Sequence, residues 1–160
     1  MRMGDVLLVT GELKLSAGLV AAQKLMYQSA ISSHVEIGLG DGTFVHATTD
    51  GGVHIAFILD ELAKCADSWR AIRLKGLNKE QEEEVAKATL HFLRQGYNHV
   101  YMGKGTDHSS FCSELVVKAY LKAGIEILGG RLPGKTTPAH FDMEADSGEL
   151  WEDRRLPIFE

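Results

Sequence analysis

The segment formed by residues 33–58 constrains the fold more than any other part of the chain, because its apolar residues alternate along the sequence. Within residues 34–39 the apolar side chains point to one side of an extended strand, whereas His34 and Glu36 point to the other. Glycine-containing turns interrupt the alternation twice, at residues 40–42 and 51–52. The pattern therefore predicts an antiparallel meander of three strands.

Further elements are predicted on both sides of the meander. An apolar run over residues 6–9 is typical of a buried strand, and residues 69–75 alternate as another strand. Apolar spacing and capping residues predict helices over residues 15–30 and 60–66, between Asn78 and Gly96, and over residues 111–123. The tail from Ile125 onward is expected to be mostly irregular, with one strand near Ile158. Because helices and antiparallel strands form separate blocks, the fold class is α+β, in a single domain spanning residues 1–160.

Composition excludes several classes of protein. Apolar residues make up 44% of the chain and charged residues 24%, a balance that suits a folded globular domain rather than a disordered chain or a membrane protein. The 17 Lys and Arg residues are scattered in a chain of formal charge −5, so a nucleic-acid partner is not expected. No apolar run is long enough for a signal peptide or an integral membrane segment, so we expect a cytoplasmic protein, with leaderless export left open. The oligomeric state stays open.

Cys112 lies near the predicted start of the helix over residues 111–123, where Ser109 or Ser110 can act as the cap. The free N–H groups and the positive end of a helix dipole favour a thiolate there, and they can also stabilise an oxyanion. Cys65 falls near the end of a short predicted helix, where the dipole disfavours a thiolate, and is therefore predicted to be structural. Two cysteines are too few for a disulfide scaffold.

His34 and His46 lie on adjacent strands of the predicted meander, and the turn between them decides whether they share a face. A two-residue turn at residues 41–42 puts the two rings on opposite faces. A three-residue loop at residues 40–42 puts them on one face as diagonal neighbours, about 7 Å apart. We predict the longer loop, because glycine suits its third position.

In that register one imidazole can act as a base for Cys112 while the other fixes its orientation and tautomer. Glu36 would lie between the two rings, opposite His46, and is a rival for the orienting role. A cysteine with two histidines suits nucleophilic catalysis, in which the sulfur attacks a carbonyl group.

Four stretches of the chain, taken in order, resemble a known family. These are the glycine-aspartate-strand segment at residues 4–9, the Ser-His-Val-Glu-Ile strand at 33–37, the strands at 44–53 and the Phe-Cys-Ser-Glu-Leu-Val helix start at 111–116. Together they resemble the circularly permuted papain-like cysteine hydrolases of the NlpC superfamily, in particular YiiX/YebB-like proteins and enzymes related to lecithin retinol acyltransferase. Glu36 departs from the small residue usual at its position.

The resemblance implies an antiparallel sheet, partly closed like a barrel, packed against the helix that carries the nucleophile. It also implies catalysis by Cys112, His34 and His46 through an acyl-enzyme, with no metal or organic cofactor. We expect hydrolysis of an amide or peptide bond in a small-molecule or peptide substrate.

Three alternatives are weighed against this hypothesis. A lipid acyltransferase would use the same site, but such relatives usually carry a membrane-anchoring segment, and the tail after Gly124 has none. A zinc protein using His34, His46 and Cys112 is less favoured, because no local pair has metal-ligand spacing. A binding module that has lost activity is disfavoured because all three catalytic residue types are present.

Overall fold

The computed structural model describes residues 1–11 and 14–154, with the side chains of residues 14–16 and 65–68 outside that description. The strands are β1 (Val6–Gly11), β2 (His34–Gly40), β3 (Thr43–Thr48), β4 (Gly52–Phe57), β5 (Cys65–Leu74), β6 (Gly96–Tyr97), β7 (Ser109–Ser110) and β8 (Trp151–Arg154). The α-helices are α1 (Lys14–Gln23), α2 (Ile58–Leu62), α3 (Lys79–His91), α4 (Cys112–Lys122) and α5 (Pro138–Ser147), with 3₁₀ turns η1 (Leu128–Gly130) and η2 (Pro133–Lys135).

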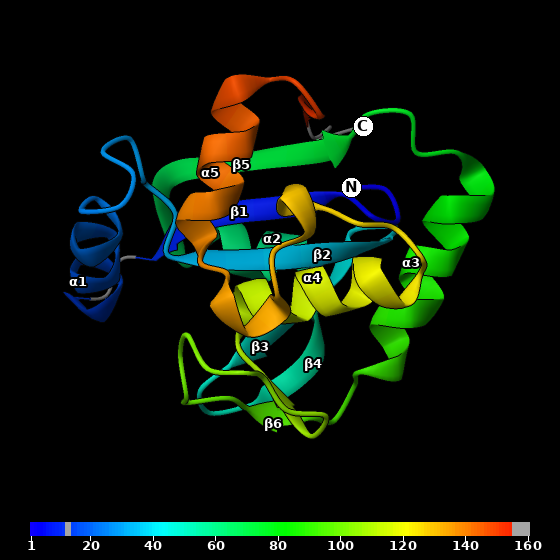
Figure 1. Cartoon of the computed structure of the whole chain (residues 1–160), viewed down its shortest axis with the longest axis horizontal. Coiled ribbons are helices and arrows are strands. Elements are labelled where there is room, and N and C mark those ends of the chain that lie inside the picture. Colours follow the sequence, from blue (N-terminus) through cyan, green and yellow to red (C-terminus); the bar gives the residue numbers. More distant parts are fainter. Residues whose placement is uncertain (12–13, 155–160) are drawn as a thin grey trace.

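An antiparallel sheet of six strands, in the order β4-β3-β2-β1-β5-β8, forms the centre of the molecule. The predicted three-stranded meander is therefore confirmed as β2, β3 and β4. In Figure 1, α4 and α5 lie across the near side of the sheet, while α2 lies behind it. The helices and the antiparallel sheet confirm the α+β class.

Alternation along the strands divides the core between the two faces of the sheet. Val6 and Leu8 of β1 join the larger apolar cluster, which includes residues of α3, α4 and α5. Leu7 and Val9 of the same strand belong to a smaller cluster, against which Ile58 and Leu62 of α2 pack. Because both faces of β1 are covered, its uninterrupted apolar run is the sequence expected of a strand buried on two sides.

The turn between β2 and β3 differs from the predicted three-residue loop. Gly40 pairs with Thr43, so the turn consists of Asp41 and Gly42, which both have positive φ values, of 49° and 73°. This combination matches the right-handed twist of a hairpin. The register then shifts by one residue, because Leu39 forms a bulge between the pairs Gly38–Phe44 and Gly40–Thr43. The bulge restores the register that the longer loop would have given.

The helix boundaries follow their predicted caps in part. Asn78 caps α3 as expected, and its side chain accepts a hydrogen bond of 2.9 Å from the backbone N–H of Gln81. That helix ends at His91, before Gly96, and α1 ends at Gln23 instead of continuing to residue 30. The N-cap of α4 is Phe111, not Ser109 or Ser110, which pair with β6 as strand β7.

The prediction of a mostly irregular tail is wrong. Residues 138–147 form α5, and residues 151–154 pair with β5 as the edge strand β8. Tertiary contacts explain both elements: Phe141 and Trp151 are completely or almost completely buried in the larger apolar cluster. The strand predicted near Ile158 lies outside the described residues.

Within the described parts of the chain, no helix is both long enough and apolar enough to cross a bilayer.

A buried ion-pair network fastens β5 to the start of β1 and to α3. Arg73 of β5 is 4% exposed and contacts the Asp5 carboxylate at 2.8 Å and the Glu82 carboxylate. Arg2 also contacts Glu82, at 2.5 Å. The Arg73 guanidinium therefore bridges two buried carboxylates, because its planar fork can donate to both, and Arg2 adds a second cation at Glu82.

We predict that Arg73→Met lowers the free energy of unfolding by about 3–5 kcal/mol, because it leaves the buried Asp5 carboxylate without its cation and Glu82 with only the exposed Arg2. Urea unfolding measures the effect. Arg70→Met is the matched control, since Arg70 pairs with Asp146 and Asp153 at the surface and its loss should cost about 1 kcal/mol or less. Equal losses in the two variants would contradict this interpretation.

Candidate active site

The structure brings His34 and His46 together on one face of the sheet. His34 opens β2 and His46 lies in β3, and the bulged register places them diagonally, with His34 Nε2 at 2.9 Å from His46 Nδ1. The His46 ring is almost fully buried, whereas about a fifth of the His34 side chain is exposed. Their common face depends on the β2–β3 register, as the sequence analysis anticipated, although the turn itself is shorter.

His54 extends this pair into a chain of three imidazoles and is not among the site residues predicted from the sequence. It lies directly opposite His46 in the β3–β4 ladder, with the two Nε2 atoms 3.0 Å apart. The signal was present in the sequence: the alternation that buries Val53 puts His54 on the same face as His46.

A backbone carbonyl fixes the tautomers along the chain of imidazoles. His54 Nδ1 lies 3.1 Å from the Gly52 carbonyl oxygen, which can only accept, so Nδ1 carries the proton. A neutral His54 then accepts at Nε2, so His46 donates from Nε2 and presents a lone pair at Nδ1. His34 therefore donates from Nε2, which leaves the lone pair of its Nδ1 free to act as a base.

Glu36 lies beside both rings, as predicted from the alternation of side chains along the strand. Its Oε1 is 3.3 Å from His46 Nδ1 and 3.6 Å from His34 Nε2. His46 Nδ1 is only 2.9 Å from His34 Nε2, so His46 and not Glu36 is the nearer orienting partner of His34. The Glu36 side chain is completely buried. Burial, with the neighbouring carboxyl of Glu61 on α2, raises the pKa of Glu36 well above its ordinary value.

Cys112 is the first residue of α4 and is 6% exposed. Burial raises the pKa of its thiol to about 11, although the backbone N–H groups of Val35, Ser113 and Cys112 itself lower it. The thiolate expected from the sequence is therefore not the resting form. Desolvation raises the thiol pKa by more than the N–H groups at the helix start lower it. In the part of the chain that the structure describes, no hydrogen bond joins the thiol to a histidine. Cys112 instead interacts with the backbone N–H of Val35, which follows His34 directly in β2.

Cys65, the other cysteine, begins β5 and not the end of a helix, and its side chain lies outside the described residues. Its predicted structural role remains a prediction.

Glu114 holds the loop before α4 against the start of that helix. Its fully buried carboxylate accepts hydrogen bonds from the Phe111 backbone N–H at 3.1 Å and from Asn98 Nδ2 at 2.9 Å. Lys118 pairs with it at 2.9 Å from one turn further along. These contacts fix the first turn of α4, and with it the position of Cys112.

The start of β2 is fixed by a different carboxylate. Asp142 of α5 is 2% exposed and accepts from the backbone N–H groups of Ile31 and Ser32, at 3.0 and 2.9 Å. Its other oxygen accepts from the Ser32 hydroxyl at 2.6 Å. The tail of the chain therefore positions the segment that leads into His34.

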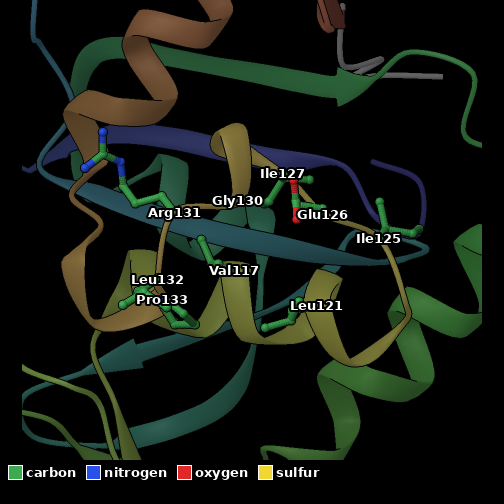
Figure 2. Close-up of a pocket in the computed structure, with 9 residues that line it drawn as sticks. All are labelled: Val117, Leu121, Ile125, Glu126, Ile127, Gly130, Arg131, Leu132 and Pro133. Atoms are coloured by element: carbon green, nitrogen blue, oxygen red, sulfur yellow. The ribbon is translucent and has the colours of Figure 1, made fainter.

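An apolar groove lies away from these residues, between α4 and the segment around η1. It is lined by Val117, Leu121, Ile125, Glu126, Ile127, Gly130, Arg131, Leu132 and Pro133 (Figure 2). Neither Cys112 nor any of the three histidines belongs to this lining.

A group of possible metal ligands occurs on the face of the sheet that carries His34, His46 and His54, the histidine face. His34, Glu36, His46 and Glu61 each contribute one ligand atom, and these four atoms lie within 4.8 Å of one another. Cys112 is not part of this group, so the ligand set considered from the sequence, with Cys112 as third ligand, is not the one that the fold assembles.

Comparisons with known proteins bear on the family and the fold. The sequence profile of a family described as permuted papain-like amidase enzymes, YaeF/YiiX, C92 family, matches residues 1–151. The solved structure of YiiX from Escherichia coli O157:H7, described as a metalloprotein, superposes with a TM-score of 0.73 at 17% sequence identity, over 96% of each chain. The comparison with curated proteins finds no match. The structural likeness supports the permuted papain-like fold.

We predict that the free energy of unfolding falls as the pH is lowered from 6.5. Unfolded imidazoles bind protons with a pKa near 6.5, whereas burial lowers the pKa of His34 to about 4 and that of His46 to about 2. The unfolded state then binds more protons, so each ring contributes a loss of about 1.4 kcal/mol per pH unit. Glu36 opposes this trend, because its folded pKa is raised.

Urea unfolding in the presence of a chelator, between pH 6.5 and about pH 5, measures the slope. Glu36→Gln removes the opposing contribution and should make the slope steeper than in the wild-type protein. Stability that is constant or that increases over this interval would contradict the assignment of neutral, buried rings.

Proposed function

Because this chain belongs to the permuted papain-like amidases of the YaeF/YiiX, C92 family, we propose that it hydrolyses an amide bond with Cys112 as nucleophile and His34 as base. The observation that carries the proposal is the chain from the Gly52 carbonyl through His54 and His46 to His34. It leaves His34 with a free lone pair at Nδ1, which a general base requires.

The proton moves together with the attack of the sulfur in this proposal. Burial favours a neutral thiol and a neutral imidazole, so no ion pair needs to exist before substrate binds. As Cys112 Sγ bonds to the carbonyl carbon, its proton passes to His34 Nδ1. His46 holds the ring through Nε2, and the imidazolium that forms is transient.

The leaving amine completes the first half of the reaction. The C–N bond breaks as the amine takes the proton from His34, and a thioester remains on Cys112. Water then attacks the thioester with His34 again as base, which releases the carboxylic acid and restores the thiol. The backbone N–H groups at the start of α4 are suited to stabilise the oxyanion in both steps.

The substrate class follows from the family more than from the site. An amide or peptide in a small molecule is the proposed substrate, and acyl transfer from a lipid ester is the rival reaction at the same residues. Exposed apolar residues Val100, Tyr101 and Met102 lie in the loop before α4, where either kind of substrate could contact them. A panel of aminoacyl, peptidyl and phospholipid substrates separates the two.

We predict that Cys112→Ala abolishes amide hydrolysis and that His34→Ala lowers kcat/KM by about a hundredfold or more. Mass spectrometry should detect an acyl group on Cys112 after reaction with an activated ester. The wild-type kcat/KM should stay constant as the pH falls from about 7 to about 5.5, because His34 has a pKa of about 4. An acid limb centred at 6.5, as for a free imidazole, would contradict the buried base.

We predict that His54→Ala lowers kcat about tenfold or more with little change in KM, because His46 loses the acceptor that fixes its tautomer. His54→Gln should retain more activity than His54→Ala, since an amide oxygen can still accept from His46 Nε2. His91→Ala is the control, as that exposed histidine lies on α3. Equal activities of the Ala and Gln variants would argue against a positioning role for His54.

A further inference from the structure

The ligand atoms of the histidine face are spaced like the corners of a metal coordination sphere. His34 Nε2, His46 Nδ1 and Glu36 Oε1 lie 2.9, 3.3 and 3.6 Å from one another. Tetrahedral zinc with bonds of about 2.0–2.2 Å places adjacent ligand atoms roughly 3.3–3.6 Å apart. Glu61, on α2, supplies a fourth atom within 4.8 Å of the others. Three separate elements thus converge on one small volume.

The cluster lacks a positive charge of its own. Glu36 is completely buried, and its Oε2 has no hydrogen-bond partner among the described residues. The adjacent group is a second carboxyl, Glu61, which can share a hydrogen bond with Glu36 only if one of them carries a proton. Lys64 is close enough to affect Glu36, but it is exposed, and no ion pair between the two occurs within the described chain.

A divalent cation would satisfy all of these groups together. Two carboxylates balance its two charges, and two imidazoles complete a ligand set that suits zinc. His46 already presents an Nδ1 lone pair, because its Nε2 proton is donated to His54. In metal sites, the second nitrogen of an imidazole ligand usually makes a hydrogen bond to a neighbouring group, which fixes the orientation of the ring.

We propose that His34 Nε2, His46 Nδ1, Glu36 and Glu61 form a binding site for one divalent transition-metal ion of the zinc type. Binding moves the proton of His34 from Nε2 to Nδ1 and releases to solvent any proton held by the two carboxyls. The exposed edge of His34 gives the ion access.

If the proposed function holds, the metal site has a consequence for catalysis. His34 Nδ1 must carry a lone pair to act as base, but it carries a proton when Nε2 binds the metal. The ion and the hydrolytic reaction therefore exclude each other at His34, so metal binding would switch the enzyme off reversibly.

Binding is tested first in Cys112→Ser protein, which needs no activity. Isothermal titration of the chelator-treated protein with Zn²⁺ should give one equivalent, with the same affinity in Cys112→Ser and wild type. Co²⁺ should give the visible absorption of a four-coordinate site without a thiolate-to-cobalt charge-transfer band. A charge-transfer band, or weaker binding in Cys112→Ser, would replace this ligand set by one containing Cys112.

Variants of three of the four ligands provide the second test. Glu36→Gln, His46→Ala and Glu61→Gln should each weaken Zn²⁺ binding at least tenfold, whereas His91→Ala should not. Glu61→Gln is the most informative, because Glu61 is only partly buried in the short helix α2 and its replacement should leave the fold intact. Zn²⁺ should raise the unfolding temperature of the wild type but not of Glu61→Gln.

The two proposals can fail separately. Absence of stoichiometric Zn²⁺ and Co²⁺ binding to the wild-type protein would overturn the metal site and leave the hydrolase untouched. Metal binding by Cys112→Ser, together with no hydrolysis of any substrate by the wild type, would uphold the site and refute the hydrolase. Inhibition of hydrolysis by Zn²⁺ that a chelator reverses is the expected result when both hold.

Discussion

The register between β2 and β3 is the constraint on which the site depends. Pairing of Ile37 with Val45 places Glu36 beside His46 and leaves His34 diagonal to it. Because side chains alternate across a sheet, a shift of one residue would move His34 and Glu36 away from His46 and turn Val35 and Ile37 out of the core. The bulge at Leu39 reconciles this register with the two-residue turn that the hairpin twist favours.

Polar groups on the histidine face are buried at a free-energy cost, and the hydrogen-bond chain offsets only part of it. His46 and His54 are satisfied through to the Gly52 carbonyl, whereas Glu36 retains an oxygen without a partner. A buried carboxyl near two imidazoles has two ways to lose its unfavourable charge, a proton or a cation. The same face can therefore serve a proton-transferring base in one state and a metal ion in another.

Much of the fold was predictable because it follows from local patterns. The meander, the buried β1 and the Asn78 cap are confirmed, since alternation, an apolar run and a capping box each act over a few residues. The helix in the tail was not predictable from spacing, because α5 is held by burial of Phe141 and by Asp142 bonding to Ser32, far away in sequence. His54 was missed because only its cross-strand pairing with His46 gives it a role.

The sequence by itself determined which residue types were available: a cysteine at a helix start, and histidines and a glutamate on alternating positions of one hairpin. It determined the family as well, through four short stretches in a fixed order. Only the tertiary structure decided that Glu61 joins the histidine face and that Cys112 rests as a buried neutral thiol. Both results depend on which elements cover which face of the sheet, and desolvation and proximity arise only once distant segments have packed together.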